Sequence, residues 1–278
     1  MVSVLATAVG LFGSLIGSFL NVVIFRVPAG RSVVAPRSAC GECSNTIRAR
    51  DNVPVLSWLL LRGRCRDCRT TISKRYPLVE LGVAVLFAIV AFAFGPAILA
   101  AGSPAETISA SLVLVAFLYF AAISVALALI DLDTGRLPNV IVLPAYLVGL
   151  ALLGSAALVV SDFVSLLRLA IGAVVLGSIY FFISMIRPGG MGFGDVKLAG
   201  VIGLFLGYLG SQQLIVGGSF AFLLGGLFAV VLLVSRKAGT KSGVPFGPWM
   251  LLAAWVGILA GAPIATGYLS LFGLGGSL

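Results

Sequence analysis

The sequence contains no histidine, and only 10% of its 278 residues are charged. Without histidine the chain cannot form a Ser–His or Cys–His nucleophilic pair, and it cannot carry the histidine-containing motif of a metalloprotease. The scarcity of charge, set against 60% hydrophobic residues, excludes a soluble domain of this length. We therefore expect a membrane protein whose chemistry depends on side chains other than imidazole.

Long apolar runs are what the sequence has in abundance. A helix needs roughly 20 apolar residues to cross a bilayer. Seven runs are of that kind, and a shorter eighth run covers 196–210. The seven longer runs are 2–25, 78–101, 108–130, 139–160, 164–186, 213–234 and 247–273. They predict an all-α polytopic membrane protein with about eight transmembrane helices.

Lysine and arginine gather in a few of the segments between these runs. Eleven of the 18 lie in segment 26–77, whereas several short gaps carry none, namely 102–107, 161–163 and 211–212. Because basic residues mark cytoplasmic loops, eight spans place the basic loops in the cytoplasm and both termini outside, and omitting 196–210 would break this pattern. The first run has no basic residue before Arg26, so we expect a membrane anchor and not a cleaved signal peptide. The net charge of +9 is thus explained by basic residues in the cytoplasmic loops. We therefore expect the chain to contact the lipid bilayer and not to bind nucleic acid.

All four cysteines lie in segment 26–77, as two C-x-x-C pairs separated by 21 residues: Cys40 with Cys43, and Cys65 with Cys68. Each pair offers two thiolates from one tight turn, and two such turns complete a tetrahedral site. Two disulfides are the alternative, but the reducing cytosol disfavours them. A site closed by four thiolates is structural, and a loop this small needs such support to fold. We therefore expect a structural zinc ion.

The apolar stretch "VPVLSWLLL" lies between the two pairs and contains Trp58. It is either the small core of the loop or a segment that rests on the membrane surface, and both interpretations stay open. The acidic residues of the loop, Glu42, Asp51 and Asp67, are expected to be solvated.

Four further carboxylates lie near the predicted cytoplasmic face of the spans: Glu80, Asp131, Asp133 and Asp195. Ionisable groups at a membrane boundary are functional candidates. We interpret Asp133 as an ion-pair partner of Arg136, three residues further on. Asp131 comes first after the unbroken apolar run "FLYFAAISVALALI", so we expect it to lie deepest. Asp195 closes the turn "PGGMGFGD" and begins the next apolar run.

Asp131 and Asp195 are predicted at similar depth on different spans, so their side chains could meet. Two adjacent carboxylates cannot both ionise and share a proton. The ionised one can activate a water molecule while the protonated one polarises a peptide carbonyl, which is the chemistry of an aspartic protease. The glycines beside Asp195 permit close backbone approach, so an extended peptide could lie there. A flexible connection between two spans is the alternative for these glycines.

Several motifs, in this order, resemble those of the bacterial type IV prepilin peptidases (leader peptidase/N-methyltransferases), a branch of the GxGD membrane aspartic proteases. The motifs are "GSFLNVVIFR", the paired C-x-x-C loop, "ISKRYPLVEL", "LIDLDTGRLPN", "GMGFGDVKL" and "VPFGPWM". The resemblance implies that Asp131 and Asp195 are catalytic. It also implies supporting or substrate-binding roles for Gly192, Gly194, Glu80 and Lys197.

The resemblance further implies a substrate, a second activity and a location. The substrate would be the leader of a prepilin or pseudopilin, cut after a glycine at the cytoplasmic face of the bacterial inner membrane. Many members also methylate the new N-terminus with S-adenosylmethionine through the cysteine-bearing loop, although 26–77 shows no glycine fingerprint for a cofactor. We expect a first span at 1–25, the cytoplasmic loop at 26–77 and a peptidase domain at 78–278.

Three competing hypotheses remain at this point. The chain could be a peptidase without methyltransferase activity. It could be a transporter coupled to protons or cations, which would use the carboxylates as a relay. It could also be a membrane-anchored module that binds nucleic acid or another partner through the basic cysteine loop.

Overall fold

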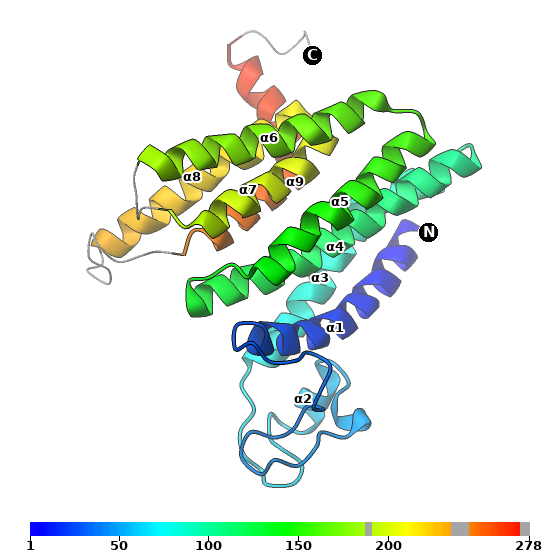
Figure 1. The fold of residues 1–278 in the computed structure, drawn as a ribbon. Coiled ribbons are helices and arrows are strands. Elements are labelled where there is room, and N and C mark those ends of the chain that lie inside the picture. The colour runs from blue at the N-terminus through cyan, green and yellow to red at the C-terminus, as the bar shows by residue number, and fades with distance from the viewer. Residues whose placement is uncertain (187–190, 235–244, 273–278) are drawn as a thin grey trace.

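The computed structural model describes residues 1–186, 191–234 and 245–272 of the chain (Figure 1). Within these residues the fold is helical apart from two isolated β-bridges. The long helices are α1 (Val2–Arg26), α3 (Arg75–Leu99), α4 (Pro104–Thr134), α5 (Asn139–Val159), α6 (Phe163–Ile186), α7 (Phe193–Leu209), α8 (Ser211–Val234) and α9 (Gly247–Ser270). A short 3₁₀ helix, η1 (Ala49–Asp51), and the short α2 (Leu56–Leu60) lie between α1 and α3.

The predicted all-α membrane fold is confirmed, with one helix shorter than the others. Seven of the described helices are long and apolar enough to cross a membrane. The eighth long helix, α7, has 17 residues, which corresponds to about 25 Å at about 1.5 Å per residue. Every residue of α7 from Leu198 to Gly207 is buried. Neighbouring helices therefore surround α7, and its limited length does not have to match the full thickness of the lipid. The predicted loop 235–245 lies almost wholly outside the described residues, and the sidedness of the termini stays a prediction.

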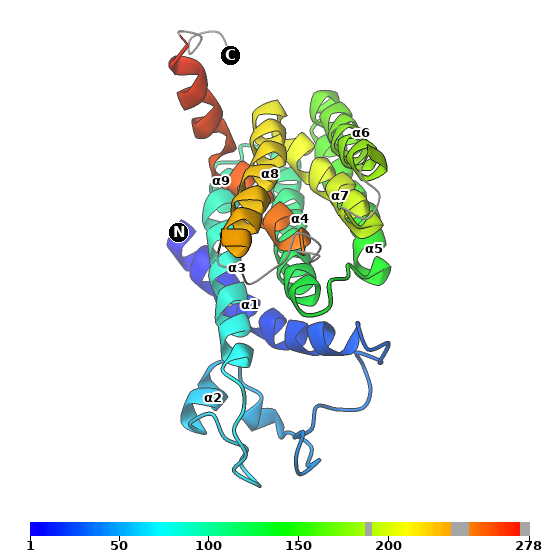
Figure 2. The same ribbon diagram turned by 90° about the vertical axis from the view of Figure 1, so that its left-hand side faces the viewer.

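Glycines allow the helices to approach closely, as is usual where apolar helices pack within lipid. A methyl group at Gly172 of α6 or at Gly203 of α7 would overlap the backbone carbonyl of the other residue. On α1, a methyl group at Gly17 would lie 2.7 Å from the Cα atom of Glu80 on α3. Figures 1 and 2 show α6 beside α7, and α1 crossing α3. These glycines therefore fix two helix pairs, and one member of each carries a candidate site residue.

An aromatic cluster joins α4, α7 and α9. The ring of Phe120 stacks on Phe205 with centroids 4.5 Å apart and contacts Trp255 at 5.5 Å. Phe117 meets Phe205 edge-on at 5.7 Å. Aromatic pairs at these separations add to the stability that burial provides. The cluster therefore holds together the three helices whose ends form the site described below.

The segment between α1 and α3 lies at one end of the bundle (Figures 1 and 2). Trp58 of α2 belongs to its small core, because the indole Nε1 donates a hydrogen bond to the carbonyl of Ile72 at 3.1 Å. Gly63 has a left-handed backbone with φ of 65°, and a methyl group there would lie 2.7 Å from the Trp58 ring. The core interpretation of "VPVLSWLLL" is thus correct for Trp58.

Candidate active site and metal centre

Asp131 lies in the last turns of α4, which continues beyond the predicted end of its apolar run. The helix ends at Gly135, whose left-handed backbone (φ 61°) lets its N–H donate to the carbonyl of Asp131 at 2.8 Å. This is a common way for a helix to end with glycine. The side chain of Asp131 is buried, with 4% of the residue exposed.

The carboxylate of Asp131 is held by the start of α9. Its Oδ2 accepts a hydrogen bond from the backbone N–H of Gly247 at 3.0 Å. A methyl group at position 247 would lie 2.8 Å from the same oxygen, so the close approach requires glycine. Gly247 lies in the motif "VPFGPWM", and no role was predicted for it.

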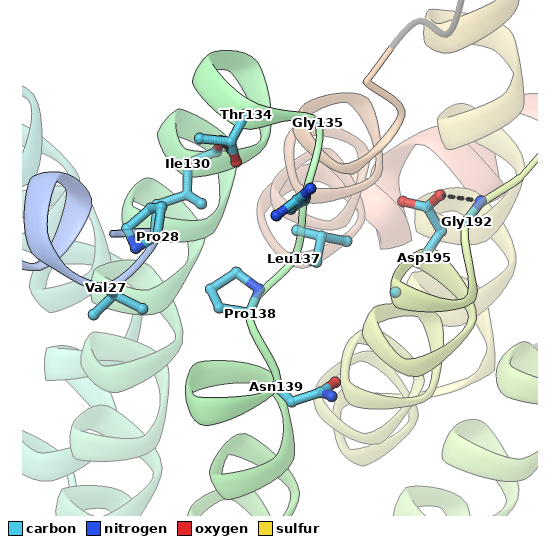
Figure 3. Close-up of a pocket in the computed structure, with 12 residues that line it drawn as sticks. Val27, Pro28, Ile130, Thr134, Gly135, Leu137, Pro138, Asn139, Gly192 and Asp195 are labelled. Carbon is cyan, nitrogen blue, oxygen red and sulfur yellow. Dashed lines mark hydrogen bonds between the residues drawn. The ribbon is translucent and has the colours of Figure 1, made fainter. Parts of the chain in front are cut away.

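Asp195 lies in the first turn of α7 and caps that helix. Its Oδ2 accepts a hydrogen bond from the backbone N–H of Gly192 at 3.1 Å, and its own N–H donates to the carbonyl of Gly192 at 3.0 Å (Figure 3). The residue is 9% exposed. Gly192 is therefore the direct backbone partner of Asp195, whereas Gly189 and Gly190 of the same motif lie outside the described residues.

Leu137 connects the surroundings of the two aspartates. It lies in the connection between α4 and α5, and a methyl group at Gly194 would lie 3.1 Å from its Cβ atom. On its other side, a methyl group at Gly247 would lie 3.3 Å from its Cδ2 atom. The starts of α7 and α9 thus meet around one leucine, so the backbone partners of Asp195 and Asp131 lie on opposite sides of the same side chain.

A cavity of about 470 Å³ opens beside Asp195 (Figure 3). Its walls come from the end of α1, the α4–α5 connection and the start of α7. The lining residues are Val27, Pro28, Ile130, Thr134, Gly135, Arg136, Leu137, Pro138, Asn139, Gly192, Gly194 and Asp195. The volume lies in the usual range for a ligand site. Asp195 borders this space directly, whereas Asp131 is not among the lining residues.

The four cysteines come together as the spacing predicts. They are free thiols, and their sulfur atoms all lie within 4.8 Å of one another. The structure therefore contains no disulfide among these four cysteines, and the disulfide alternative is wrong. The sulfurs of Cys40 and Cys68, one from each pair, are 3.7 Å apart. The cluster is therefore placed to hold a metal ion.

The two cysteine pairs sit in turns of the same construction. In the first, the N–H of Cys40 donates to the carbonyl of Asn45 at 2.9 Å, and in the second the N–H of Cys65 donates to Thr70 at 2.8 Å. Four residues after the first cysteine of each pair, the backbone is left-handed: Ser44 has φ of 58° and Arg69 has φ of 62°. Each turn thus presents its two sulfurs in the same way. This arrangement suits an ion that is bound between the two turns with tetrahedral coordination.

Comparison with known proteins adds evolutionary evidence to this geometry. A model of the bacterial peptidase A24 N-terminal domain matches residues 11–94, and a model of the type IV leader peptidase family matches 118–234. A prepilin leader peptidase/N-methyltransferase from Stutzerimonas stutzeri is 34% identical over 92% of this chain and 91% of its own length. Proteins of the same name from Aeromonas hydrophila (36% identical; 94% and 93%) and Pseudomonas aeruginosa (34%; 95% and 93%) are similar over comparable shares.

The chain belongs to the type IV leader peptidase family. The resemblance stated from the sequence is therefore confirmed. The N-terminal family model covers the four cysteines, and the leader peptidase model covers both Asp131 and Asp195. No solved structure matches the chain.

Lys197 and Glu80, the two other side chains predicted for this site, lie in surroundings that differ from each other. Lys197, two residues after Asp195, donates from Nζ to Oδ1 of the cavity residue Asn139 at 3.0 Å, and its ammonium lies 5.1 Å from the ring centre of Phe193. Glu80 is buried and accepts a hydrogen bond from the backbone N–H of Val55 at 2.6 Å. Lys197 is thus next to the cavity, while Glu80 attaches the cysteine-bearing segment to α3.

The predicted pairing of Asp133 with Arg136 is wrong. Asp133 accepts two hydrogen bonds from Arg75 at the start of α3, at 2.9 and 2.6 Å. The physical reason is the left-handed Gly135, which ends α4 before Arg136 and removes it from the helical face that carries Asp133. Arg136 lines the cavity instead. Arg75 and Asp133 therefore connect the end of the cysteine-bearing segment to the helix of Asp131.

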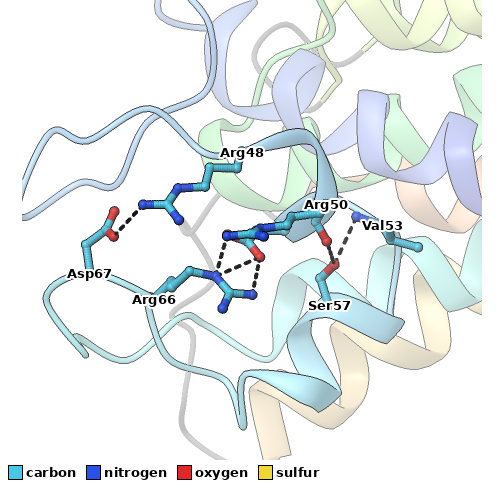
Figure 4. A network of polar contacts seen from close by, with 7 residues as sticks. Arg48, Arg50, Val53, Ser57, Arg66 and Asp67 are labelled. Carbon is cyan, nitrogen blue, oxygen red and sulfur yellow. Dashed lines mark hydrogen bonds and ion pairs between the residues drawn. The ribbon is translucent and has the colours of Figure 1, made fainter.

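The expectation of solvated carboxylates holds for the exposed Asp67 but is wrong for Asp51, whose side chain is only 9% exposed. Arg66 binds the Asp51 carboxylate with two nitrogens, Nε at 2.8 and 3.0 Å and Nη2 at 2.5 Å, and Arg48 contacts Asp67 at 3.4 Å (Figure 4). The hydrogen bonds from Arg66 lower the pKa of the Asp51 carboxyl below its ordinary value. Each pair joins the first half of the segment to the second. The two cysteine turns are thus held together by side chains as well as by their sulfurs.

The thiols of the cluster differ in acidity. Hydrogen bonds from the backbone N–H groups of Cys43 and Glu42 lower the pKa of the Cys40 thiol to about 7. At Cys68 a backbone hydrogen bond from Thr70 acts in the same direction, but desolvation and the neighbouring thiols outweigh it and raise the pKa to about 12. Without an ion, the four sulfurs therefore cannot all be thiolates at neutral pH, because their negative charges repel. A cation would compensate that repulsion and displace the protons.

Proposed function

We propose that this protein is an aspartic endopeptidase of the bacterial inner membrane that removes the leader of prepilins or pseudopilins and methylates the new N-terminal residue. Membership of the leader peptidase family supports the first activity, and the names of the relatives support both. The observation that carries the proposal is the geometry of Asp131 and Asp195. They are two buried carboxylates from different helices, each held at Oδ2 by a backbone N–H, and Asp195 lines a cavity.

In the proposed reaction the two aspartates share one proton. The ionised carboxylate takes a proton from a water molecule, whose oxygen attacks the carbonyl carbon of the scissile peptide bond. The protonated carboxylate donates its proton to the carbonyl oxygen. When the tetrahedral intermediate collapses, the leaving nitrogen takes the proton that the first carboxylate received from water, the hydroxyl of the intermediate returns a proton to the other carboxylate, and the peptide bond breaks. The backbone hydrogen bonds from Gly247 and Gly192 keep the carboxylates in place during these transfers.

The substrate is proposed to lie extended in the cavity, against the backbone at Gly192 and Gly194. Side chains there would separate a peptide from the Asp195 carboxylate. Lys197 and Asn139 hold each other at the cavity edge, and we assign them a role in shaping that edge. Glu80 has a more distant supporting role, because it fastens the cysteine-bearing segment to α3.

The metal is proposed to be zinc, held by Cys40, Cys43, Cys65 and Cys68. Tetrahedral zinc with sulfur ligands at about 2.3 Å requires sulfurs about 3.8 Å apart, and the separation of Cys40 and Cys68 is 3.7 Å. Four protein ligands close the site, so the ion stabilises the segment and does not take part in the reaction. S-adenosylmethionine would supply the methyl group to the new amine, and no described residues are assigned to hold it.

The proposed arrangement in the membrane follows the distribution of basic residues. Both termini face the outside, and the cysteine loop, 26–77, lies in the cytoplasm with the cleavage site. We keep the proposed division into a first span at 1–25, this loop, and a peptidase domain at 78–278.

The test is co-expression with a candidate prepilin, followed by mass spectrometry of the prepilin N-terminus. Asp131→Asn and Asp195→Asn should each abolish cleavage while the protein still inserts into the membrane. Asp162→Asn is the matched control, because Asp162 lies between α5 and α6 and binds the backbone N–H and the hydroxyl of Ser165. Asparagine can accept from that N–H through Oδ1 and donate to the hydroxyl through Nδ2. Normal cleavage by either of the first two variants would refute the peptidase assignment. A cleaved but unmethylated product would identify a peptidase without the second activity.

A further inference from the structure

The short helix α2 has one covered face and one uncovered face. Ser57 is 7% exposed, and Trp58 packs on Gly63 in the core of the segment. The leucines at 56, 59 and 60 are 53%, 58% and 74% exposed. Residues three and four apart share one side of a helix, so Leu59 and Leu60 flank Leu56 on the uncovered face. Three adjoining exposed leucines are not expected on a surface that faces only water.

Helix α2 is attached to α3 at the level of the membrane boundary. The backbone N–H of Val55, directly before α2, donates to the Glu80 carboxylate at 2.6 Å. Glu80 is the sixth residue of α3, or about 7.5 Å along its axis at about 1.5 Å per residue. Exposed apolar residues on α3 already begin at Leu78, which is 65% exposed, and Leu81, which is 51% exposed. Because each polar interface of a bilayer is only about 5–8 Å thick, α2 begins at the depth where headgroups meet acyl chains.

In both views of the ribbon α2 lies next to the start of α3, at the end of the helix bundle (Figures 1 and 2). Side-chain and backbone bonds keep it there: Ser57 donates to the carbonyl of Arg50 at 3.1 Å and accepts from the N–H of Val53 at 3.0 Å (Figure 4). A helix of five residues has no stability of its own in water. Its orientation is therefore imposed by these contacts and by Glu80, and the leucines are held outward.

We infer that Leu56, Leu59 and Leu60 form a lipid-binding foot that enters the bilayer leaflet next to the start of α3. An apolar face at the interface between headgroups and acyl chains is the mode by which amphipathic helices bind membranes. The exposed Arg62 and Arg64 follow the foot directly, at the level where anionic headgroups would attract them. The foot fixes the height of the cysteine-bearing segment above the membrane, independently of the reaction that the protein catalyses.

The inference is tested with the full chain in lipid vesicles. A photoreactive benzoylphenylalanine replaces Leu59, and after irradiation the covalent adducts are identified by mass spectrometry. Leu78 on α3 is the lipid-facing reference, and the exposed Glu42 in the first cysteine turn is the polar reference. We expect lipid adducts at position 59 at a yield comparable to position 78 and several-fold above position 42. The vesicles are prepared with phosphatidylcholine alone and with added phosphatidylglycerol, and the anionic lipid should raise the yield.

Two outcomes would overturn the inference: a lipid yield at position 59 as low as at position 42, or adducts at 59 mainly with a co-reconstituted prepilin. A second measurement covers the case in which the photoreactive variant does not fold. In the vesicles, trypsin should cleave after Arg62 several-fold faster in the variant Leu59→Asn/Leu60→Asn than in the unmodified protein. In detergent without a bilayer the two rates should be similar. Equal rates in vesicles would also contradict the foot.

Discussion

Replacing Gly247 by alanine should slow cleavage without removing any hydrogen bond. The added methyl group would lie 2.8 Å from Oδ2 of Asp131, 3.4 Å from its Cγ atom and 3.3 Å from Cδ2 of Leu137. Alanine keeps the backbone N–H that binds Asp131, so the change is purely steric. An ordinary contact needs about 3.4 Å or more, so the carboxylate has to move away by about 0.6 Å.

A displacement of this size is large for a catalytic group. A misplacement of about 1 Å can cost about a hundredfold in rate, so we expect kcat to fall between about tenfold and a hundredfold. Crowding a well-packed site also costs about 1–3 kcal/mol of stability. KM should change less, because Gly247 does not line the cavity in which the substrate is proposed to bind.

The assay is cleavage of a purified prepilin in detergent micelles, with kcat and KM measured separately and the thermal unfolding of each variant recorded. Gly267→Ala on the same helix is the matched control, since a methyl group there would meet no atom within 4 Å. That variant should cleave normally and unfold at the same or a higher temperature. If folded Gly247→Ala retains the kcat of the unmodified protein, the steric reasoning about Asp131 is wrong.

Three further predictions concern packing, an ion pair and the metal. Gly203→Val should lower the unfolding temperature sharply, because its side chain would overlap the α6 backbone, whereas Gly82→Val, with open space around it, should not. Reversing one charge with Arg75→Asp should reduce activity, and the double variant Arg75→Asp/Asp133→Arg should restore part of it; no restoration would mean that the pair does not position α4. Cys65→Ser should reduce bound zinc, measured by elemental analysis, and strong acidification should release it from the unmodified protein because protons compete for the thiolates. A purified protein that holds no metal at neutral pH would contradict the zinc assignment.

Much of the fold and of the site could be predicted because the relevant signals are local. The long apolar runs coincide with the helices, since a bilayer leaves the backbone little alternative to internal hydrogen bonding. The C-x-x-C spacing predicted the sulfur cluster, because each pair occupies a single turn. Asp131 and Asp195 were singled out by depth, and their positions at the ends of α4 and α7 follow from where the apolar runs stop and start. Their catalytic roles stay a prediction.

Contacts between distant segments could not be predicted in the same way. The Asp133 carboxylate pairs with Arg75, 58 positions away, and a left-handed turn at Gly135 removed the nearer Arg136 from reach. The choice between these partners depends on how α3 packs against α4. A prediction from the three-residue spacing alone does not include that packing, so it paired Asp133 with Arg136 and not with Arg75.

The sequence by itself determined the membrane-spanning character, the positions of the helices, the four-thiol cluster and the absence of any histidine-based mechanism. These properties depend on composition and on spacings within a few residues. The tertiary structure alone decided that Gly247 binds Asp131 across 116 positions, that Leu137 joins the starts of α7 and α9, and that Glu80 of α3 binds the backbone directly before α2. Each of these depends on which helix ends meet in space, and that is set by close packing at glycines and aromatic rings throughout the bundle.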